Sequence, residues 1–407
     1  MKLFINRWGA IILCFSIMFI PICKVHASVD NISLFSDKAI SVVADTGEVI
    51  YSKNGEKMDF PASTTKIMTA ILLMEHLKKN DYITFSDQSL KQVKSNSQII
   101  FSKGEKLDRN TALETMMILS ANDLAYAIGE RVAGNIPAFV QMMNQKAKEI
   151  GATHTNFVTP NGLHNNNHYT TPHDLALIAR EAMKYPEIMS AMGMKSAIIS
   201  TSIQKNKYIF NRGNMFTNPN FYAGKTGFTN EARNTLVEID KKNGETIINV
   251  LLHSSKPQYL KDIKLLDDYA FSHLRQAKLI NKNDWQQTLK IEDLKVKAIL
   301  KDDVNVLTAA PKNEDLTIKI IPKKINMNQL NKIGIKKDEI VGTLEVWNGN
   351  TKIKQVNLFS KNNYEVKNKV EKTSIFFSSL ILSSVLIILS LFRGVRSKQR
   401  YKMQKRG

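Results

Sequence analysis

The chain has only two cysteines among its 407 residues, and both lie close to its N-terminus. Cys14 and Cys23 fall in a segment with a basic start, an apolar run from Ala10 to Ile22, and the small-residue site Val25-His26-Ala27. This order is typical of an export signal, residues 1–27, that is cleaved after Ala27. Cleavage would remove both cysteines and so exclude disulfide bonds and thiol catalysis. An uncleaved anchor is the alternative, although the uncharged run is short for a bilayer span.

Charged residues are absent from the 20 residues 373–392, and acidic residues are absent from the tail that follows. That tail, residues 393–407, carries seven lysines and arginines. We therefore expect a transmembrane helix over 373–392 and a basic cytoplasmic tail, with the rest of the chain on the extracytoplasmic face of the cell membrane. A buried core helix is the alternative interpretation, but such a helix would be flanked by further chain on both sides and not by a terminal basic tail.

Acidic residues are scarce overall, with 37 Asp and Glu against 57 Lys and Arg and a net charge of +20. The tail contributes seven of these charges and the signal three, which leaves +10 on residues 28–372. An exported surface with this excess suits anionic envelope polymers or lipid headgroups. We expect no nucleic-acid partner.

Residues 28–372 are enough for two domains, and the apolar periodicity changes near His273. In the first part, residues 39–51 alternate around a turn and predict a hairpin, and a helix that is apolar on most sides follows Pro61. The pattern stays helical from Leu107 to Lys184. This arrangement predicts a first domain over residues 28–273.

Strand patterns return after this helical region. Residues 234–239 and 246–252 read as strands joined through Asn243-Gly244, a favoured hairpin turn, and a helix is expected over 260–271. The element order predicts an α/β fold with an antiparallel sheet flanked by helices, plus a helical region. Residues 274–372 have short strand segments separated by charged turns and predict a β-rich spacer domain.

Three short motifs contain side chains that could take part in catalysis: Ser63-Thr64-Thr65-Lys66, Ser120-Ala121-Asn122 and Lys225-Thr226-Gly227. The first pattern recurs at 202–205, the second at 52–54 and 360–362, and the third occurs once. Ser63 is expected at the start of the buried helix, where free backbone N–H groups favour negative charge. Lys66 is then on the same face and within reach of the Ser63 hydroxyl.

A free lysine has a pKa of about 10.4 and is a poor base at neutral pH. The site would have to lower the pKa of Lys66 by burial and by a second cation, for which Lys225 is the candidate.

The motifs and their order resemble the D-alanyl-D-alanine carboxypeptidases, the low-molecular-mass penicillin-binding proteins. The resemblance extends to the segments 157–163 and 168–175 and to Phe228-Thr229, and it covers roughly residues 35–272. It implies a β-lactamase/transpeptidase-like catalytic domain that acts on peptidoglycan stem peptides ending in D-Ala-D-Ala. β-Lactam antibiotics would be covalent inhibitors.

The resemblance also implies a role for each motif residue. Ser63 would be the nucleophile, Lys66 the general base, and Ser120 a proton relay. The substrate-binding residues would be Asn122, Lys225, Thr226, Gly227 and Phe228. Of these, Asn122 would hold the substrate backbone, Lys225 with Thr226 would bind the terminal carboxylate, and the backbone N–H groups of Ser63 and Phe228 would form an oxyanion hole.

Gly227 is expected to let the substrate lie close against the strand. Two departures stand out. Arg233 occupies a position where many members have glycine, and the segment 252–256 lacks the arginine that some members use near the carboxylate.

Other functions using the same acyl-enzyme remain open. A transpeptidase would differ only in the acceptor, and a non-enzymatic β-lactam sensor would keep the fold and lose turnover. A β-lactamase is disfavoured because no Glu-x-x-Leu-Asn occurs in the chain. A P-loop ending at Lys225 is excluded by Pro219, which stands where the first glycine is required.

No cofactor or metal is expected. The residues His164, His168, His173 and Asp174 could suggest a metal site, but the asparagines between the first two do not favour a helix that would align them.

The two ends of the chain generate the first prediction. Deleting residues 373–407 should release active enzyme into the medium, because the uncharged span would be the only lasting anchor once the signal is cleaved. Fractionation of cells followed by immunoblotting measures this. Retention of the truncated chain at the membrane would contradict it.

Overall fold

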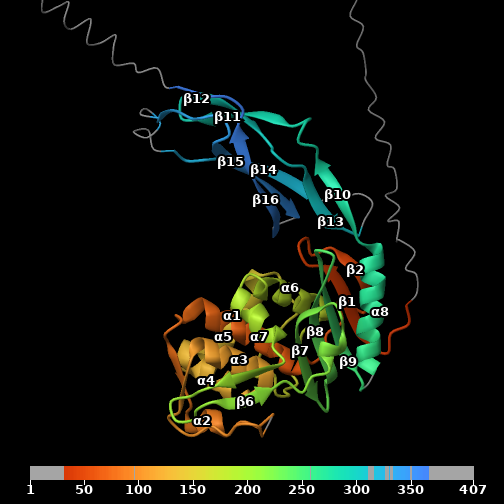
Figure 1. The fold of residues 1–407 in the computed structure, drawn as a ribbon. Coiled ribbons are helices and arrows are strands. Elements are labelled where there is room, and N and C mark those ends of the chain that lie inside the picture. Colours follow the sequence, from red (N-terminus) through yellow and green to blue (C-terminus); the bar gives the residue numbers. More distant parts are fainter. Residues whose placement is uncertain are drawn as a thin grey trace, which may run out of the picture. The chain divides into compact units, whose positions relative to one another are not determined.

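The computed structural model describes residues 32–365, except for 96, 257, 310–315, 326–329, 331–332 and 349–350 (Figure 1). The predicted signal, membrane span and tail therefore lie outside the described residues. Within the described residues, no helix has both the length and the apolar character needed to cross a bilayer.

A five-stranded antiparallel sheet is the centre of the first part of the chain, and its strand order is β2-β1-β9-β8-β7. The strands are β1 (Lys38–Val43), β2 (Val49–Lys53), β7 (Phe221–Thr229), β8 (Arg233–Lys242) and β9 (Glu245–Ser254). The predicted hairpins β1–β2 and β8–β9 are confirmed. Asn243 and Gly244 both have positive φ, 53° and 84°, as the tight turn between two strands requires.

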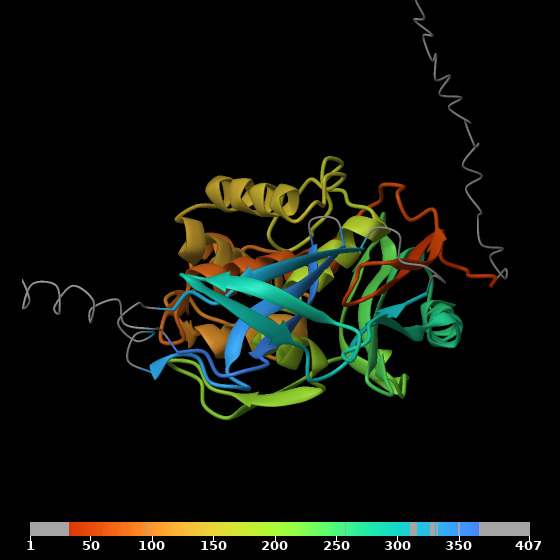
Figure 2. The same ribbon diagram turned by 90° about the horizontal axis from the view of Figure 1, so that it is seen from above.

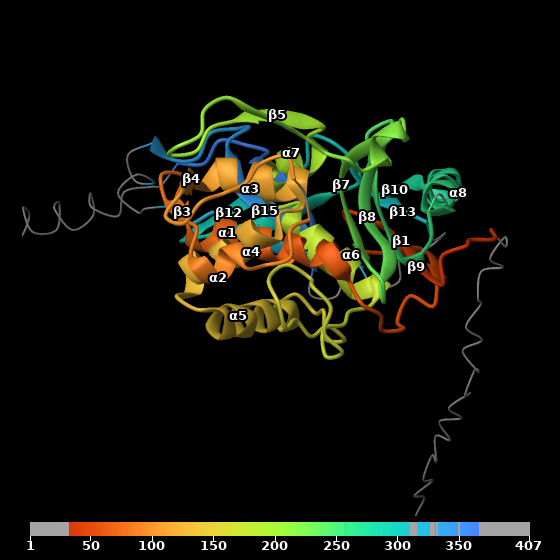
Figure 3. The ribbon, with the colours of Figure 1, turned by 90° about the horizontal axis from the view of Figure 1, so that it is seen from below.

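Helices cover both faces of this sheet. The long helix α8 (Gln258–His273) lies on one side of the sheet and the helical region on the other, as Figures 2 and 3 show. The helices of that region are α1 (Lys66–His76), α2 (Asp87–Leu90), α3 (Arg109–Leu119), α4 (Asn122–Ala133), α5 (Ile136–Glu149), α6 (Pro172–Ala182) and α7 (Pro186–Gly193). The predicted antiparallel sheet with flanking helices is confirmed.

Helix α1 is the core of the helical region. Its first eight residues, from Lys66 to Leu73, are all buried, which explains why its sequence is apolar on most sides. Because the helix is enclosed, a polar side chain at its N-terminal end must find partners inside the protein.

The helical region is less continuous than the sequence predicts. Residues 151–171 form a long loop, because Gly151, Pro160 and Gly162 interrupt the apolar periodicity. Two small antiparallel strand pairs were also not predicted. They are β3 (Tyr82–Thr84) with β4 (Lys106–Asp108), and the hairpin of β5 (Ser196–Ile199) with β6 (Lys207–Phe210).

Residues 275–365 form the predicted β-rich domain. Five strands pair in the order β11-β12-β16-β15-β14, and β10 pairs with β13. The strands are β10 (Arg275–Ile280), β11 (Gln286–Ile291), β12 (Leu294–Ile299), β13 (Val304–Thr308), β14 (Leu316–Pro322), β15 (Ile340–Asn348) and β16 (Thr351–Ser360). A separate apolar core, which includes Val296, Leu344 and Leu358, holds the domain together.

Three carboxyl groups are buried together between the sheet and α8. Glu238 and Asp240 lie on β8 and Asp267 on α8, and all three are almost inaccessible to water. Their hydrogen-bond donors are amides: the Asn218 Nδ2 donates to all three, and the Asn249 Nδ2 to the two aspartates. Burial raises the pKa of Glu238 to about 7, and burial with the neighbouring carboxyl groups raises the pKa of Asp240 well above its usual range.

This cluster predicts that the protein loses stability as pH rises. Unfolded carboxyl groups have pKa values of about 4, so the raised pKa values stabilise the fold fully below pH of about 4. That stabilisation is lost as pH rises through about 7. The loss is about 1.4 kcal/mol per pH unit for each extra proton that the folded state holds.

The substitution Asp240→Asn removes one titrating group and should flatten the fall in melting temperature between pH 5.5 and 8.5. Asp268→Asn is the matched control, because Asp268 is an exposed residue of α8 that pairs with Lys264 on the surface of that helix. If wild type and Asp240→Asn lose stability in parallel, the cluster is not the cause.

Candidate active site

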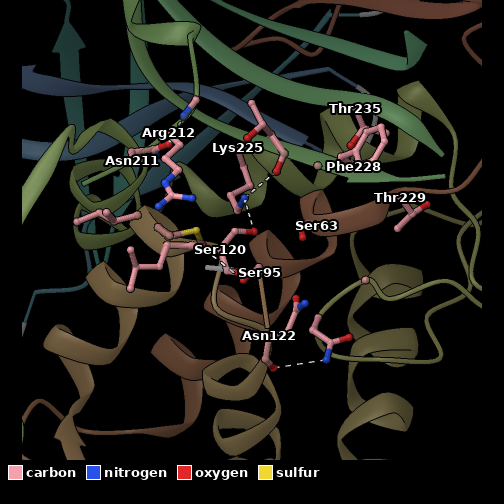
Figure 4. Close-up of a pocket in the computed structure, with 18 of the residues that line it drawn as sticks. Ser63, Ser95, Ser120, Asn122, Asn211, Arg212, Lys225, Phe228, Thr229 and Thr235 are labelled. Carbon is pink, nitrogen blue, oxygen red and sulfur yellow. Dashed lines mark hydrogen bonds between the residues drawn. The ribbon is translucent and has the colours of Figure 1, made fainter. Parts of the chain in front are cut away.

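A pocket of about 410 Å³ opens beside the edge strand β7 (Figure 4). Seven of the eight predicted site residues line it: Ser63, Ser120, Asn122, Lys225, Thr226, Gly227 and Phe228. The eighth, Lys66, is fully buried beneath it. Three chain segments that are far apart in sequence thus meet at one place.

Ser63 lies in η1 (Ala62–Thr65), a 3₁₀ turn that precedes α1. The residue before it, Ala62, has a φ of +48°, which is uncommon for a residue with a side chain. The Pro61 carbonyl holds this turn, because it accepts hydrogen bonds from the Thr64 hydroxyl at 2.7 Å and from the Thr235 hydroxyl on β8 at 2.9 Å. The turn that carries Ser63 is therefore fixed to the sheet.

Two glycines allow the chain to pass close to this turn. A Cβ on Gly162 would lie 1.9 Å from the Ala62 carbonyl oxygen, and a Cβ on Gly227 would lie 2.7 Å from the Ser63 backbone nitrogen. The structure thus adds a second reason for glycine at position 227. A side chain there would collide with the turn that carries Ser63 and with the Thr235 hydroxyl, at 2.4 Å.

The Lys66 ammonium makes three hydrogen bonds. Its Nζ donates to the Ser63 Oγ at 2.9 Å, to the Asn122 Oδ1 at 2.7 Å and to the Asn161 carbonyl at 2.7 Å. An amide oxygen and a carbonyl oxygen only accept. If Lys66 is neutral, its two N–H groups can satisfy those two oxygens, and its lone pair is left facing the Ser63 hydroxyl. The geometry thus aims a base at Ser63.

The environment of Lys66 favours this neutral form. Burial lowers the pKa of Lys66 well below its usual value, and the positive charge of Lys225 lowers it further. The carboxyl of Asp123 acts in the opposite direction, but Asp123 is itself buried and its own pKa is raised by that burial. The predicted influence of Lys225 on Lys66 is thus present.

Ser120 lies between α3 and α4 in a left-handed conformation, with φ of 54°. This turn aims its hydroxyl into the pocket, where the Lys225 Nζ donates to it at 3.0 Å (Figure 4). Lys225 also donates to the Thr226 carbonyl at 2.7 Å. Burial lowers the pKa of Lys225 to about 7.

Two further residues, which were not predicted as site residues, support the site. The Asn161 carbonyl binds Lys66, and the Asn161 amide donates to the Gln92 side chain at 3.1 Å. The His168 Nδ1 accepts from the backbone N–H groups of Val158 and Thr159, so its Nε2 carries the proton and donates to the Thr65 hydroxyl at 2.9 Å. Burial lowers the pKa of His168 to about 3 and keeps the ring neutral.

The repeated motif at 202–205 has no such surroundings. The Ser202 hydroxyl is exposed and accepts from the Lys106 backbone, while the Lys205 Nζ donates to the Thr201 carbonyl instead of Ser202. Arg233, which stands where many members have glycine, has a φ of +55°, a conformation that glycine adopts without strain.

The state of Lys66 generates a prediction on pH. Covalent labelling of the protein by a fluorescent penicillin should slow as pH falls, because a protonated Lys66 cannot accept the Ser63 proton. Between pH 8 and 9 the rate should be nearly constant, since a lysine with the ordinary pKa of about 10.4 would instead make it rise about tenfold per pH unit. Stopped-flow or gel-based labelling measures these rates.

Lys66→Arg should label very slowly at every pH, because a guanidinium stays protonated. Lys205→Arg at the repeated motif is the control and should behave as wild type. A labelling rate independent of pH from 5 to 9 would require a different base.

Comparison with known proteins places these residues in a family. A family model described as D-alanyl-D-alanine carboxypeptidase matches residues 24–256, and one described as the C-terminal domain of penicillin-binding protein 5 matches residues 275–366. The D-alanyl-D-alanine carboxypeptidase DacF of Bacillus subtilis is 32% identical over 319 residues, which span 75% of this chain and 80% of DacF.

Solved structures agree. The D-alanyl-D-alanine carboxypeptidase of Mycobacterium tuberculosis H37Rv aligns with a TM-score of 0.57 and 26% identity over 61% of this chain and 95% of its own. DacD from Francisella tularensis, at 23% identity, shares the fold with a TM-score of 0.57 over 83% of this chain and 95% of its own. The chain belongs to the D-alanyl-D-alanine carboxypeptidase family and is a serine-type D-Ala-D-Ala carboxypeptidase of peptidoglycan metabolism.

Proposed function

We propose that Ser63 attacks the carbonyl between the two terminal D-alanines of a stem peptide while Lys66 accepts the hydroxyl proton. The observation that carries this assignment is the lysine environment: two oxygen acceptors hold the N–H groups of Lys66 and leave its third position 2.9 Å from the Ser63 Oγ. A bond forms between Ser63 and the carbonyl carbon, and the bond from that carbon to the terminal D-Ala nitrogen breaks.

Ser120 is proposed as the proton relay to the leaving amine. Its hydroxyl accepts from Lys225, so its own proton is free to point toward the leaving nitrogen. The proton that Lys66 took from Ser63 then replaces the one that Ser120 gives away. Water afterwards attacks the ester, and its proton returns the site to the starting state.

The remaining motif residues are proposed to hold the substrate. Lys225 and Thr226 bind the terminal carboxylate from the edge of β7. The Asn122 Nδ2 has one hydrogen on the Val93 carbonyl, at 2.7 Å, and a second that can reach the peptide backbone. The Ser63 N–H lies beside Gly227, so the N–H groups of Ser63 and Phe228 are suited to share the oxyanion.

The setting of the enzyme is proposed from its ends. Export by residues 1–27 and anchoring by residues 373–392 would hold a catalytic domain, residues 28–273, on the extracytoplasmic face of the cell membrane, with residues 274–372 as a spacer. Peptidoglycan is the partner found on that face, and β-lactams reach the same pocket as covalent inhibitors.

Release of D-alanine from a D-Ala-D-Ala stem peptide tests the proposal. The purified ectodomain should release one D-alanine per peptide over many turnovers, whereas Ser63→Ala should release none, because the substitution removes the hydroxyl that faces the Lys66 amine. Ser202→Ala should keep full activity. Mass spectrometry of the products measures the release.

Equal release by wild type and Ser63→Ala would contradict the assignment. Formation of a peptide bond to an added amine acceptor in place of hydrolysis would favour the transpeptidase function. Fast multiple turnover of penicillin without D-alanine release would favour a β-lactamase.

A further inference from the structure

The pocket is lined by four cationic residues and, among the lining residues that the structure describes, by no acidic one. The cations are Lys94, Arg212, Lys225 and Lys256. They come from four separate segments: the loop after α2, the loop after β6, β7 itself, and the end of β9. This uneven distribution of charge indicates a ligand that carries negative charge.

Lys225 serves the reaction already described and is a poor source of further positive charge. It is buried, and its Nζ is held by the Ser120 hydroxyl and the Thr226 carbonyl. Its lowered pKa of about 7 also leaves it partly neutral at physiological pH. One terminal carboxylate at Lys225 therefore leaves the other three cations without a partner in the substrate.

Lys94 is fixed at the pocket by its two neighbours. The Val93 carbonyl accepts from the Asn122 Nδ2 at 2.7 Å, and the Ser95 hydroxyl donates to the Ser120 carbonyl at 2.6 Å. The residues on both sides of Lys94 are thus hydrogen-bonded to the Ser120-Ala121-Asn122 motif. Lys94 itself is exposed, and no ion pair is formed by it within the described part of the chain.

Arg212 approaches from another element. It follows β6 directly, its side chain extends toward the pocket in Figure 4, and its guanidinium lies 5.8 Å from the centre of the Phe210 ring. Arg212 is exposed and makes no ion pair with any described residue. A guanidinium keeps its charge at any physiological pH and can bind a carboxylate through two parallel hydrogen bonds.

We propose that Lys94 and Arg212 bind a second carboxylate of the stem peptide, distinct from that of the terminal D-alanine. The enzyme then selects stem peptides that carry this extra negative charge over those in which it is amidated. The inference rests on the proposed function, since it assigns a substrate preference to the same pocket. Lys256, which follows β9 and also lines the pocket, adds to the positive potential.

Two sources can supply this carboxylate: the side chain of the third residue, or the free α-carboxylate of a γ-linked second residue. Three synthetic peptides distinguish them. In the first both carboxylates are free, in the second only the side-chain carboxylate of the third residue is amidated, and in the third only the α-carboxylate of the second residue is amidated. We expect amidation of the contacted group to lower kcat/KM about tenfold, mainly through KM, and amidation of the other to have little effect. Raising the salt concentration should shrink the difference.

The double variant Lys94→Gln and Arg212→Gln should bring the ratio of kcat/KM between free and amidated peptides close to one. The matched control is the double variant Lys103→Gln with Lys148→Gln. It removes the same formal charge from two exposed residues that do not line the pocket, of which Lys103 pairs with Asp87. The control should keep the wild-type ratio. If a general attraction of the protein for anions caused the preference for free peptides, both double variants would lose that preference equally, and the inference would be wrong.

Melting temperatures of both double variants should match wild type, because all four side chains are exposed. A wild-type ratio near one for both amidated peptides would overturn the inference, and so would an unchanged ratio in Lys94→Gln with Arg212→Gln. Absence of turnover by wild type on all three peptides would be a different result: it would overturn the proposed function, and this inference with it.

Discussion

The buried amine of Lys66 is the group around which the site is organised. An uncharged amine in the core has only two N–H groups to give, and two oxygens from distant parts of the chain receive them, one from Asn122 and one from Asn161. A buried charge without compensation would destabilise the fold by several kcal/mol. Burial therefore favours the deprotonated form of Lys66, which can accept a proton, and it also requires the loops that surround Lys66 to be in place.

Burial also favours the neutral form of the acid cluster on the other side of the sheet, but there it raises the pKa, whereas it lowers the pKa of Lys66. Glu238, Asp240 and Asp267 are also buried with like neighbours, and they too shift toward their neutral forms. Neutral lysine gives a base, because the amine gains a lone pair. Neutral carboxylic acid gives a donor for hydrogen bonds, so the cluster joins α8 to β8 and contributes to stability only while protons remain bound.

Much of this site could be predicted from the sequence, because its side chains lie in short motifs with fixed local geometry. Lys66 follows Ser63 by one helical turn, and Lys225 to Gly227 lie in one strand, so spacing alone indicates their relation. The alternation of residues 234–252 around Asn243-Gly244 likewise indicates the β8–β9 hairpin. Local rules suffice where the partners are near in sequence.

What could not be predicted depends on contacts between distant segments. The Asn161 carbonyl is a backbone group, and no residue type signals that it will face Lys66. The contact of Gly227 with the Ser63 turn was not predicted either, because it joins residues 164 positions apart in the sequence. The β5–β6 hairpin, which brings Arg212 to the pocket, has exposed apolar residues on a short ribbon and no clean alternation of buried and exposed positions.

The contact between Gly162 and Ala62 has a consequence for how the protein opens. There is no room for even one methyl group between them, and hydrogen bonds from Lys66 to the Asn161 carbonyl and between Thr65 and His168 connect the loop 151–171 to the serine turn. The two should behave as one cooperative unit in hydrogen exchange, with amides on both segments becoming exposed together. We therefore expect the substrate to enter a site that is already assembled, and we expect discrimination to depend on charge and shape at the pocket and not on a closing lid.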